Sequence, residues 1–279
     1  EVFMKKVWYA PNSFEAYGEE EIQAVVSCLR DGWLAGFGKK TVEFEEKVSD
    51  LFGKKYGIFV NSGSSACLLA IACLDLPKGS EIITPACTFS TTVAPIIQLG
   101  FKPVFCDVNL TSYVPEIDDV VSKITENTKA VMIPNLIGNK PNWKSLKEKL
   151  IEINRQDIVV IEDSADTITM TEETDISTTS FYASHIDDRF NHEVDGIPYD
   201  FKFLYGVLGY NFKCSEMNAA FGLVQLEKFA NFRLIRRTNI ERYIENLKDL
   251  EQVLLPNDSI KPNWLAIPLQ SKNRLELLR

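Results

Sequence analysis

Short apolar runs alternate with longer amphipathic segments along most of this chain. The runs have the length and the β-branched content of buried strands, whereas apolar residues recur at helical spacing in the segments between them. Strands are expected at residues 56–60, 81–84, 103–106, 130–133, 158–161, 178–186 and 264–269. Helices are expected at residues 19–29, 42–52, 67–74, 89–99, 117–124, 143–153, 215–229 and 235–247. This alternation predicts an α/β domain built on a largely parallel sheet.

Residues 178–186 form a hydroxyl-rich stretch that delivers a histidine. Phe181, Ala183 and His185 alternate with the residues between them, which places the two sets on opposite faces of a strand. His185 is one of 2 histidines in the chain. A single histidine beside apolar residues more often makes a hydrogen bond in the core than takes part in catalysis. The stretch alone therefore favours a structural role.

The stretch from Asn61 to Ala66 reads NSGSSA and lies between a predicted strand and a predicted helix. In such a turn, backbone N–H groups at the start of the helix converge on an anion, and serine hydroxyls add further donors. Ser and Gly are also common where a helix simply needs an N-cap. A phosphate site and an ordinary capped helix both remain open.

The segment IEDSAD places acidic side chains directly after a buried strand. A carboxylate at the position of Asp163 is costly to bury without a partner, and the cationic ring nitrogen of a cofactor would be a suitable one. The alternative is that Asp163 is the N-cap of a following helix. In a parallel sheet, the carboxyl end of this strand is also where ligands collect.

Charge and composition exclude several classes of partner. The net charge of −9 and the isoelectric point near 5.0 argue against a nucleic-acid coat and an anionic membrane surface, because both attract basic faces. No run approaches the roughly 20 apolar residues of a membrane helix, and the N-terminus lacks the pattern of a secretory signal. We therefore expect a soluble, cytoplasmic protein. The 6 cysteines show no CxxC spacing, so we expect free, mostly buried thiols and no metal site.

Five stretches together resemble the DegT/DnrJ/EryC1/StrS family of sugar aminotransferases. They read FEEKVSDLFGKKYGIFVNSGSSA, TPACTFSTTVAP, IEDSAD, TTSFYASH and GYNFKCSEMNAAFGLVQLEK. They occur in family order from about Thr41 to Lys228. The resemblance implies the fold-type-I architecture of enzymes that use pyridoxal 5′-phosphate (PLP): an α/β fold with a mostly parallel central sheet flanked by helices, and a smaller second domain.

The resemblance also divides the chain. Residues 1–40 would form an N-terminal arm and helix, and residues 41–228 the large PLP-binding α/β domain. Residues 229–279 would be the start of a small C-terminal domain that is incomplete here.

Cofactor contacts follow from the matched motifs. Gly63, Ser64 and Ser180 would bind the phosphate, and Phe89 would stack on the pyridine ring. Asp163 would pair with the protonated ring nitrogen, which keeps the ring an electron sink.

Two further residues belong to the implied site. Asp166 lies in the same IEDSAD segment and is expected to bind the cofactor. Asn211 of GYNFK would reach the phosphate of the neighbouring subunit's cofactor, which implies a homodimer with shared sites.

The chain departs from the family at His185. Family aminotransferases carry there, five residues after the serine that matches Ser180, the lysine that holds the cofactor covalently. Imidazole cannot form that bond, but it can move protons near neutral pH. The replacement is similar to the 3-dehydrase branch of the family, and it implies noncovalently bound PLP or its amine form, pyridoxamine 5′-phosphate (PMP).

The implied reaction is C3 dehydration of a nucleotide-linked 4-keto-6-deoxy sugar, with His185 as the proton-transfer base and L-glutamate as the amino donor. Such a reaction belongs to the biosynthesis of the 3,6-dideoxysugars of surface polysaccharides, including the lipopolysaccharide O-antigen. Two alternatives remain open. One is a nucleotide-sugar aminotransferase whose lysine lies in unseen sequence, and the other is a catalytically silent protein that binds a nucleotide sugar or a partner.

The chain passes directly from Ile186 to Asp187, where the family has a glycine-rich segment. We therefore expect residues to be missing between these two positions. An iron–sulfur branch of the family places cluster cysteines in that segment. No thiolate group suited to such a cluster is visible in the sequence, and the segment that resumes at Asp187 lacks the cysteine of that branch. With residues missing there, the absence of cluster cysteines is weak evidence, but the missing cysteine near Asp187 favours the iron-free route.

Overall fold

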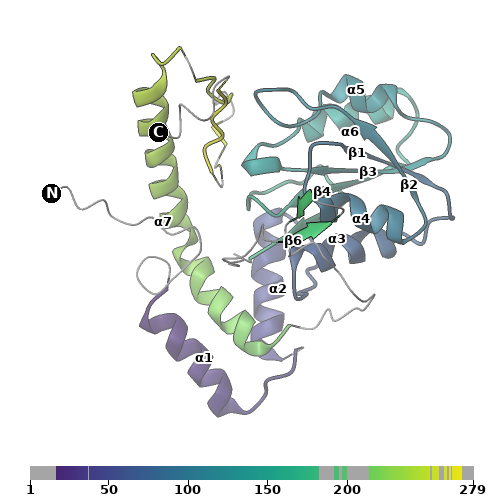
Figure 1. Ribbon diagram of the computed structural model, residues 1–279. Helices are drawn as coiled ribbons and strands as arrows, with labels where there is room; N and C mark the ends of the chain where they lie inside the picture. The colour runs from purple at the N-terminus through teal and green to yellow at the C-terminus, as the bar shows by residue number, and fades with distance from the viewer. Residues whose placement is uncertain are drawn as a thin grey trace.

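The computed structural model describes residues 17–36, 38–181, 192–194, 197–199, 214–251, 253–257, 261–262, 264 and 266–271. A parallel sheet with the strand order β2-β1-β3-β4-β5 lies at its centre (Figure 1). Its strands are β1 (Glu81–Pro85), β2 (Lys102–Cys106), β3 (Thr128–Pro134), β4 (Val159–Ser164) and β5 (Ile176–Thr179). The chain runs outward from β1 to β2 and then returns to β3 on the other side. The strand order therefore reverses beside β1, which is where parallel sheets open a ligand-binding crevice.

Helices cover both faces of the sheet (Figure 1). One face carries α5 (Ile117–Ser122) and α6 (Trp143–Glu152), and the other carries α3 (Gly63–Ala72) and α4 (Ser90–Gln98). Neighbouring strand residues point to opposite faces. Ile83 accordingly packs in the cluster beneath α5 and α6, whereas Ile82 packs beneath α3 and α4.

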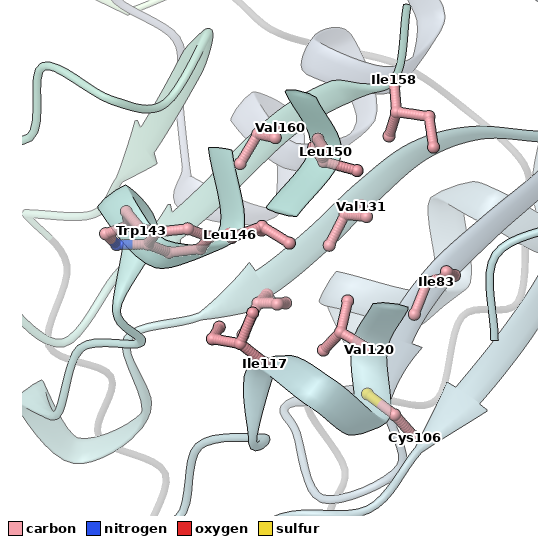
Figure 2. Close-up of a cluster of buried hydrophobic side chains, with 11 residues drawn as sticks. Ile83, Cys106, Ile117, Val120, Val131, Trp143, Leu146, Leu150, Ile158 and Val160 are labelled. Atoms are coloured by element: carbon pink, nitrogen blue, oxygen red, sulfur yellow. The ribbon is translucent and has the colours of Figure 1, made fainter. Parts of the chain in front are cut away.

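The cluster between the sheet and α5 and α6 is shown in Figure 2. Val131 and Val160 contribute from the central strands, and Leu146 and Leu150 from α6. All four side chains are buried. Because both faces of the sheet are covered in this way, the middle parts of its central strands are apolar, as the sequence pattern indicates.

A second region joins three helices away from the sheet. The 32-residue α7 (Glu216–Leu247) runs along one side of the molecule (Figure 1), and α1 (Glu19–Asp31) and α2 (Lys39–Phe52) pack against it. Phe44 of α2 packs with Ala219 and Leu223 of α7. We call the contact of these three helices the helix joint.

Two buried carboxylates hold the helix joint. Glu216 accepts hydrogen bonds from the backbone N–H groups of Gly38 (3.0 Å), Lys40 (2.8 Å) and Thr41 (3.0 Å), and from the Thr41 hydroxyl. A side chain at the start of α7 therefore satisfies the amides at the start of α2, which have no partner inside their own helix.

Glu21 of α1 is the second carboxylate. It accepts hydrogen bonds from Lys228 Nζ (2.7 Å), Gln225 Nε2 (2.6 Å) and Gly18 N (2.8 Å). The Glu21 carboxylate therefore accepts hydrogen bonds from side chains of α7 and from the backbone that precedes α1.

Most of the expected strands are confirmed. Residues 81–84, 103–106, 130–133 and 159–161 fall in β1 to β4, and Ile158 lies directly before β4. The strand expected at 178–186 begins earlier, as β5, and ends at Thr179; residues 182–186 lie outside the described part of the chain.

Two strand predictions are wrong. Residues 56–60 are not in a strand, and Tyr56 and Ile58 are 77% and 71% exposed. This segment pairs with no strand among the described residues, so its apolar pattern has no ladder to join. The described residues of 264–269 are not in a strand either; an isolated bridge joins Leu254 to Gln270 nearby.

The helix predictions hold with one correction. The helices expected at 215–229 and 235–247 are one continuous helix, α7, capped by Ser215, whose side chain accepts a hydrogen bond from Asn218 N. The predicted domain boundary after residue 228 therefore falls inside a helix. A short antiparallel pair, β6 (His192–Val194) and β7 (Ile197–Tyr199), was not among the expected elements.

All 6 cysteines are free, as expected. Cys28, Cys67 and Cys106 are buried, but Cys73 and Cys87 are exposed, so the expectation of burial holds only in part. No helix within the described ranges has the length and apolar character needed to cross a membrane. No cluster of three metal-binding side chains occurs among the same residues.

Candidate functional site

The carboxyl ends of the strands bring several of the predicted site residues to one edge of the sheet. Asp163 is near the end of β4, Ser180 follows β5, and Phe89 lies between β1 and α4. Gly63 begins α3 beside them, because a Cβ placed on it would lie 2.9 Å from Cβ of Ser180. We call Gly63, Phe89, Asp163 and Ser180 the rim site.

Asp163 is the buried acid of the rim site and is only 6% exposed. Its Oδ2 accepts a 2.8 Å hydrogen bond from the hydroxyl of Thr92, and its Oδ1 accepts a longer one, 3.3 Å, from Ala165 N. Burial raises the pKa of Asp163, while the hydrogen bonds from Thr92, Cys67 and Ala165 oppose that rise. The carboxylate therefore has neutral donors only, which leaves its negative charge uncompensated.

The helix-capping role considered for Asp163 is wrong. Asp163 lies within β4, and the residues after it form a turn and irregular chain that lead to β5 without a helix. No backbone N–H of a helix needs this carboxylate. A role toward a bound partner is the interpretation that remains.

The start of α3 combines both features considered for the NSGSSA turn. Ser62 is the N-cap, and its hydroxyl accepts a hydrogen bond from Ser65 N at 3.1 Å. The N–H groups of Gly63 and Ser64 donate to no acceptor within the described residues. They are available to an anion at the positive end of the helix.

A cavity of about 400 Å³ adjoins this turn. It is lined by α2, by residues 56–63, by β5 and the two residues after it, and by the start of α7. Gly63 and Ser180 line it, whereas Asp163 and Phe89 do not. Of the phosphate-binding candidates, Gly63 and Ser180 thus border this cavity, and Ser64 is not part of its lining.

Phe89 stands immediately before α4 and is 42% exposed. The backbone N–H of Thr92 donates to the carbonyl of Phe89 at 3.0 Å. One helical turn therefore presents both an accessible aromatic ring and the hydroxyl that holds Asp163. An accessible ring at this edge suits stacking on a planar ligand.

Asp166 is tied to the loop after β3. Its Oδ2 accepts a 2.7 Å hydrogen bond from the backbone N–H of Ile137, and burial raises its pKa. Ile137 has a φ of 60°, an unusual conformation for a β-branched residue. Asp166 therefore stabilises a strained turn at the rim. Among the described residues it makes no hydrogen bond to another predicted cofactor-binding side chain, but its charge adds to the rise in the pKa of Asp163.

Two predicted residues, His185 and Asn211, lie outside the described part of the chain. Their roles as proton-transfer base and as phosphate ligand of a neighbouring subunit stay predictions.

Sequence reasoning missed the residues that support Asp163. Thr92 and Cys67 form hydrogen bonds to Asp163, and Thr88 forms one to Thr92. All three residues are far from Asp163 in the sequence. Thr92 could have been found from its position three residues after Phe89, which puts both on one side of a helix. Cys67 gave no comparable signal, because a cysteine in an apolar helix is ordinary core.

Comparisons with known proteins agree with this arrangement. The model of the DegT/DnrJ/EryC1/StrS aminotransferase family matches residues 15–186 and, separately, residues 184–279. The lipopolysaccharide biosynthesis protein RfbH of Salmonella typhimurium is 31% identical over 334 residues, covering 96% of this chain and 76% of that protein. The GDP-4-keto-6-deoxy-D-mannose 3-dehydratase of Escherichia coli O55:H7 is 28% identical over 318 residues, covering 96% of this chain and 80% of that protein.

A solved structure gives the same result for the fold. The E. coli GDP-4-keto-6-deoxy-D-mannose-3-dehydratase with bound hydrated PLP superposes with a TM-score of 0.76 at 26% identity, covering 94% of this chain and 78% of that one. The fold is therefore that of the PLP-dependent aminotransferases, as the motifs imply. The family model extends over nearly all of the sequence, and this chain belongs to the DegT/DnrJ/EryC1/StrS aminotransferase family.

Proposed function

We propose that this protein catalyses the PLP/PMP-dependent C3 dehydration of a nucleotide-linked 4-keto-6-deoxyhexose, with His185 as the proton-transfer base. The observation that carries the proposal is the buried carboxylate of Asp163, which has only neutral hydrogen-bond donors. Two printed names support the choice of reaction, because the E. coli O55:H7 relative and the superposed structure are both 3-dehydratases of GDP-4-keto-6-deoxy-D-mannose.

The residues at the rim site fit a pyridoxal-type cofactor. No lysine or arginine of the described residues lies within ion-pair distance of Asp163, so a cationic ring nitrogen would compensate its charge. The N–H groups of Gly63 and Ser64 at the start of α3 suit a phosphate, and Ser180 lies against Gly63. Phe89 offers an accessible ring for stacking.

Each residue then has one task. Asp163 holds a proton on the ring nitrogen; Gly63, Ser64 and Ser180 hold the phosphate; and Phe89 excludes water from one ring face. When bound, the cofactor supplies an electron-withdrawing ring. His185 takes and returns a proton while the C3–oxygen bond of the sugar breaks and water leaves. Histidine suits this task because its pKa lies near neutral pH.

We propose that Asp166 supports the cofactor site indirectly. It holds the Ile137 turn beside the rim by accepting the hydrogen bond from the Ile137 N–H. Asn211 is proposed to complete the phosphate site of a neighbouring subunit.

A homodimer is part of this proposal. On and just after α1, the large apolar side chains of Ile22, Leu29 and Trp33 are 45%, 51% and 62% exposed. A second copy of the chain would cover such a face, because water contact with it is unfavourable. Light scattering coupled to size exclusion should give twice the chain mass, and a monomer at micromolar concentration would contradict the dimer.

Two observations support residues missing between Ile186 and Asp187. The family model matches the chain in two separate pieces, residues 15–186 and 184–279, which meet at residues 184–186. The alignment with RfbH runs over 334 residues, more than the 279 of this chain. Sequencing of the source transcript across this junction tests the expectation, and an uninterrupted Ile186–Asp187 codon pair would contradict it.

The function is tested by product analysis. The protein is incubated with PLP, L-glutamate and GDP- or CDP-linked 4-keto-6-deoxyhexoses, and the sugar products are identified by mass. We expect a product without the C3 oxygen. A product that keeps this oxygen and gains an amine would instead identify an aminotransferase, and no turnover of either nucleotide sugar would favour the silent binder.

Variants at His185 sharpen the assay. His185→Asn removes the proton-transfer group and should abolish C3 deoxygenation. His185→Lys should also abolish it while allowing covalent attachment of PLP. Retained dehydration in both variants would refute the role given to His185.

A further inference from the structure

We propose that Thr92 is a positioning residue whose hydroxyl, held in turn by Thr88, keeps Asp163 ionised and oriented so that the ring nitrogen of the bound cofactor stays protonated. The inference rests on the proposed function, in which Asp163 faces that nitrogen. It concerns two threonines to which neither the sequence motifs nor the comparisons give a role.

The geometry forms a short chain of hydrogen bonds. The Oγ1 of Thr88 donates to Oγ1 of Thr92 at 2.9 Å, and Oγ1 of Thr92 donates to Oδ2 of Asp163 at 2.8 Å. Thr92 is fully buried, so no water competes for its hydroxyl. Its one proton is therefore committed to the carboxylate.

The direction of this chain depends on the charge of Asp163. An ionised carboxylate only accepts hydrogen bonds, so Thr92 must donate to it and is left to accept from Thr88. Each bond polarises the next one, which strengthens the donation to the carboxylate. The two hydroxyls therefore select the ionised form of Asp163 over the neutral form.

Thr92 makes the shortest hydrogen bond to this carboxylate among the described residues. The Ala165 N–H lies 3.3 Å from Oδ1, and the thiol of Cys67 is a weak donor. Burial raises the pKa of Asp163, and the hydrogen bond from Thr92 is the first of the contacts that lower it.

The same helical turn also carries Phe89. The Thr92 N–H donates to the Phe89 carbonyl at 3.0 Å. The start of α4 therefore fixes the stacking ring and the carboxylate relative to each other. Loss of the Thr92 hydroxyl should disturb the protonation of the ring nitrogen more than the position of the ring.

The test uses PLP labelled with ¹⁵N in the ring, bound to the full-length protein, with the protonation of that nitrogen measured by NMR. Thr92→Val keeps the shape of the side chain and removes the hydroxyl. We expect the ring-nitrogen signal to move toward the unprotonated position and PLP affinity to fall about tenfold, as for the loss of a hydrogen bond to a charged group. Thr92→Ser should restore both, and Thr88→Val should give a smaller change in the same direction.

Thr91→Val is the matched control, because Thr91 makes no hydrogen bond to Asp163 and is equally β-branched. It should leave the nitrogen signal unchanged. Circular dichroism checks that each variant is folded. If Thr92→Val does not fold, Thr88→Val and Thr92→Ser decide, since an unaltered signal in Thr88→Val or an unprotonated one in Thr92→Ser overturns the proposal.

Asp163→Asn separates the two levels of the argument. If it alters the nitrogen signal while folded Thr92→Val does not, the inference about Thr92 is wrong and the proposed site stands. If wild-type protein binds no PLP, or Asp163→Asn leaves the signal unchanged, the assignment of Asp163 itself is wrong, and the inference falls with it.

Discussion

The rim site and the helix joint both bury carboxylates, but they treat them in opposite ways. Glu216 is 3% exposed and Asp163 is 6% exposed. Glu216 nevertheless receives three backbone N–H groups and a hydroxyl, and its pKa is lowered, although burial raises it. Asp163 has fewer donors, one of them at 3.3 Å, and burial raises its pKa. Glu216, whose charge is fully hydrogen-bonded, stabilises the fold. Asp163, whose charge is only partly hydrogen-bonded, is suited to binding a cationic ligand.

The largest expected effect comes from Asp163→Asn. Activity should fall by about 10²–10³-fold, because an oriented charge at the reacting group is lost. The free energy of unfolding of the cofactor-free protein should stay the same or rise, since the buried charge is removed. Steady-state kinetics and urea unfolding on the same preparation test these two expectations. A large loss of stability in Asp163→Asn would show that Asp163, like Glu216, stabilises the fold.

Glu216→Ala should produce the reverse pattern. Unfolding free energy should fall by about 3 kcal/mol, because several amides at the start of α2 lose their acceptor in a buried place. Urea unfolding measures the loss. Glu227→Ala, on an exposed position of the same helix, is the control and should change stability by less than about 0.5 kcal/mol. If the two variants were equally stable, Glu216 would have no special role in stabilising the fold.

Substituting alanine for Gly222 in the helix joint and for Gly63 in the rim site compares how tightly the two regions are packed. A Cβ on Gly222 would lie 2.6 Å from the Phe44 ring in the helix joint. Gly222→Ala should therefore cost about 1–3 kcal/mol of stability by overpacking, offset in part by about 1 kcal/mol of helix propensity. Chemical unfolding gives the value.

Gly63→Ala places the same methyl group at the rim site, where it would lie 2.9 Å from Cβ of Ser180. We expect PLP affinity to weaken by about tenfold, or about 1.4 kcal/mol, with a smaller loss of stability than in Gly222→Ala. Fluorescence titration with PLP tests this. Affinity equal to that of the wild type would show that the approach of Gly63 to Ser180 has no part in binding.

The smallest effect concerns pH. Burial raises the pKa of Glu21, but Lys228, Gly18 and Gln225 lower it to about 2 from 4.5. Because the folded-state pKa is lowered, the stabilisation is present above pH 4.5 and is lost as pH falls toward 2. Lys228→Met should reduce stability near neutral pH, because Glu21 loses its charged donor, and should flatten the acid-side decline. Unfolding curves between pH 2 and 7 measure it, with Lys248→Met as the exposed control.

Asp163 should show the opposite sign. Its folded-state pKa is raised, so its contribution is most favourable at low pH and is lost as pH rises through that pKa. As pH rises above 3.8, the free energy of unfolding of wild type should therefore fall relative to that of Asp163→Asn. A shift in the same direction as that of Glu21 would contradict the contrast between the two regions.

The sequence predicts the sheet well because the central strands β1, β3 and β4 are buried on both faces. Ile82 and Ile83 point to different clusters, so the strand reads as a continuous apolar run without knowledge of its neighbours. Residues 56–60 carry the same pattern and form no strand among the described residues. Strand formation there depends on a partner, which a local pattern cannot show.

The candidate site could be predicted only where a residue belongs to a local motif. Asp163 and Gly63 stand in recognisable segments. Glu21 was visible only as one of three acids in a first helical turn, whereas its partners Gln225 and Lys228 lie on α7. Thr92 was hidden in the same way, because its role depends on a carboxylate from another strand.

The central claim is that the rim site holds PLP noncovalently, with histidine at the position of the family's lysine. The most direct measurement is the intact mass of the protein after loading with PLP and reduction by borohydride. Wild-type protein should keep the mass of the bare chain, and His185→Lys should gain one pyridoxyl phosphate group. A stoichiometric adduct on the wild type would contradict the claim and favour an aminotransferase.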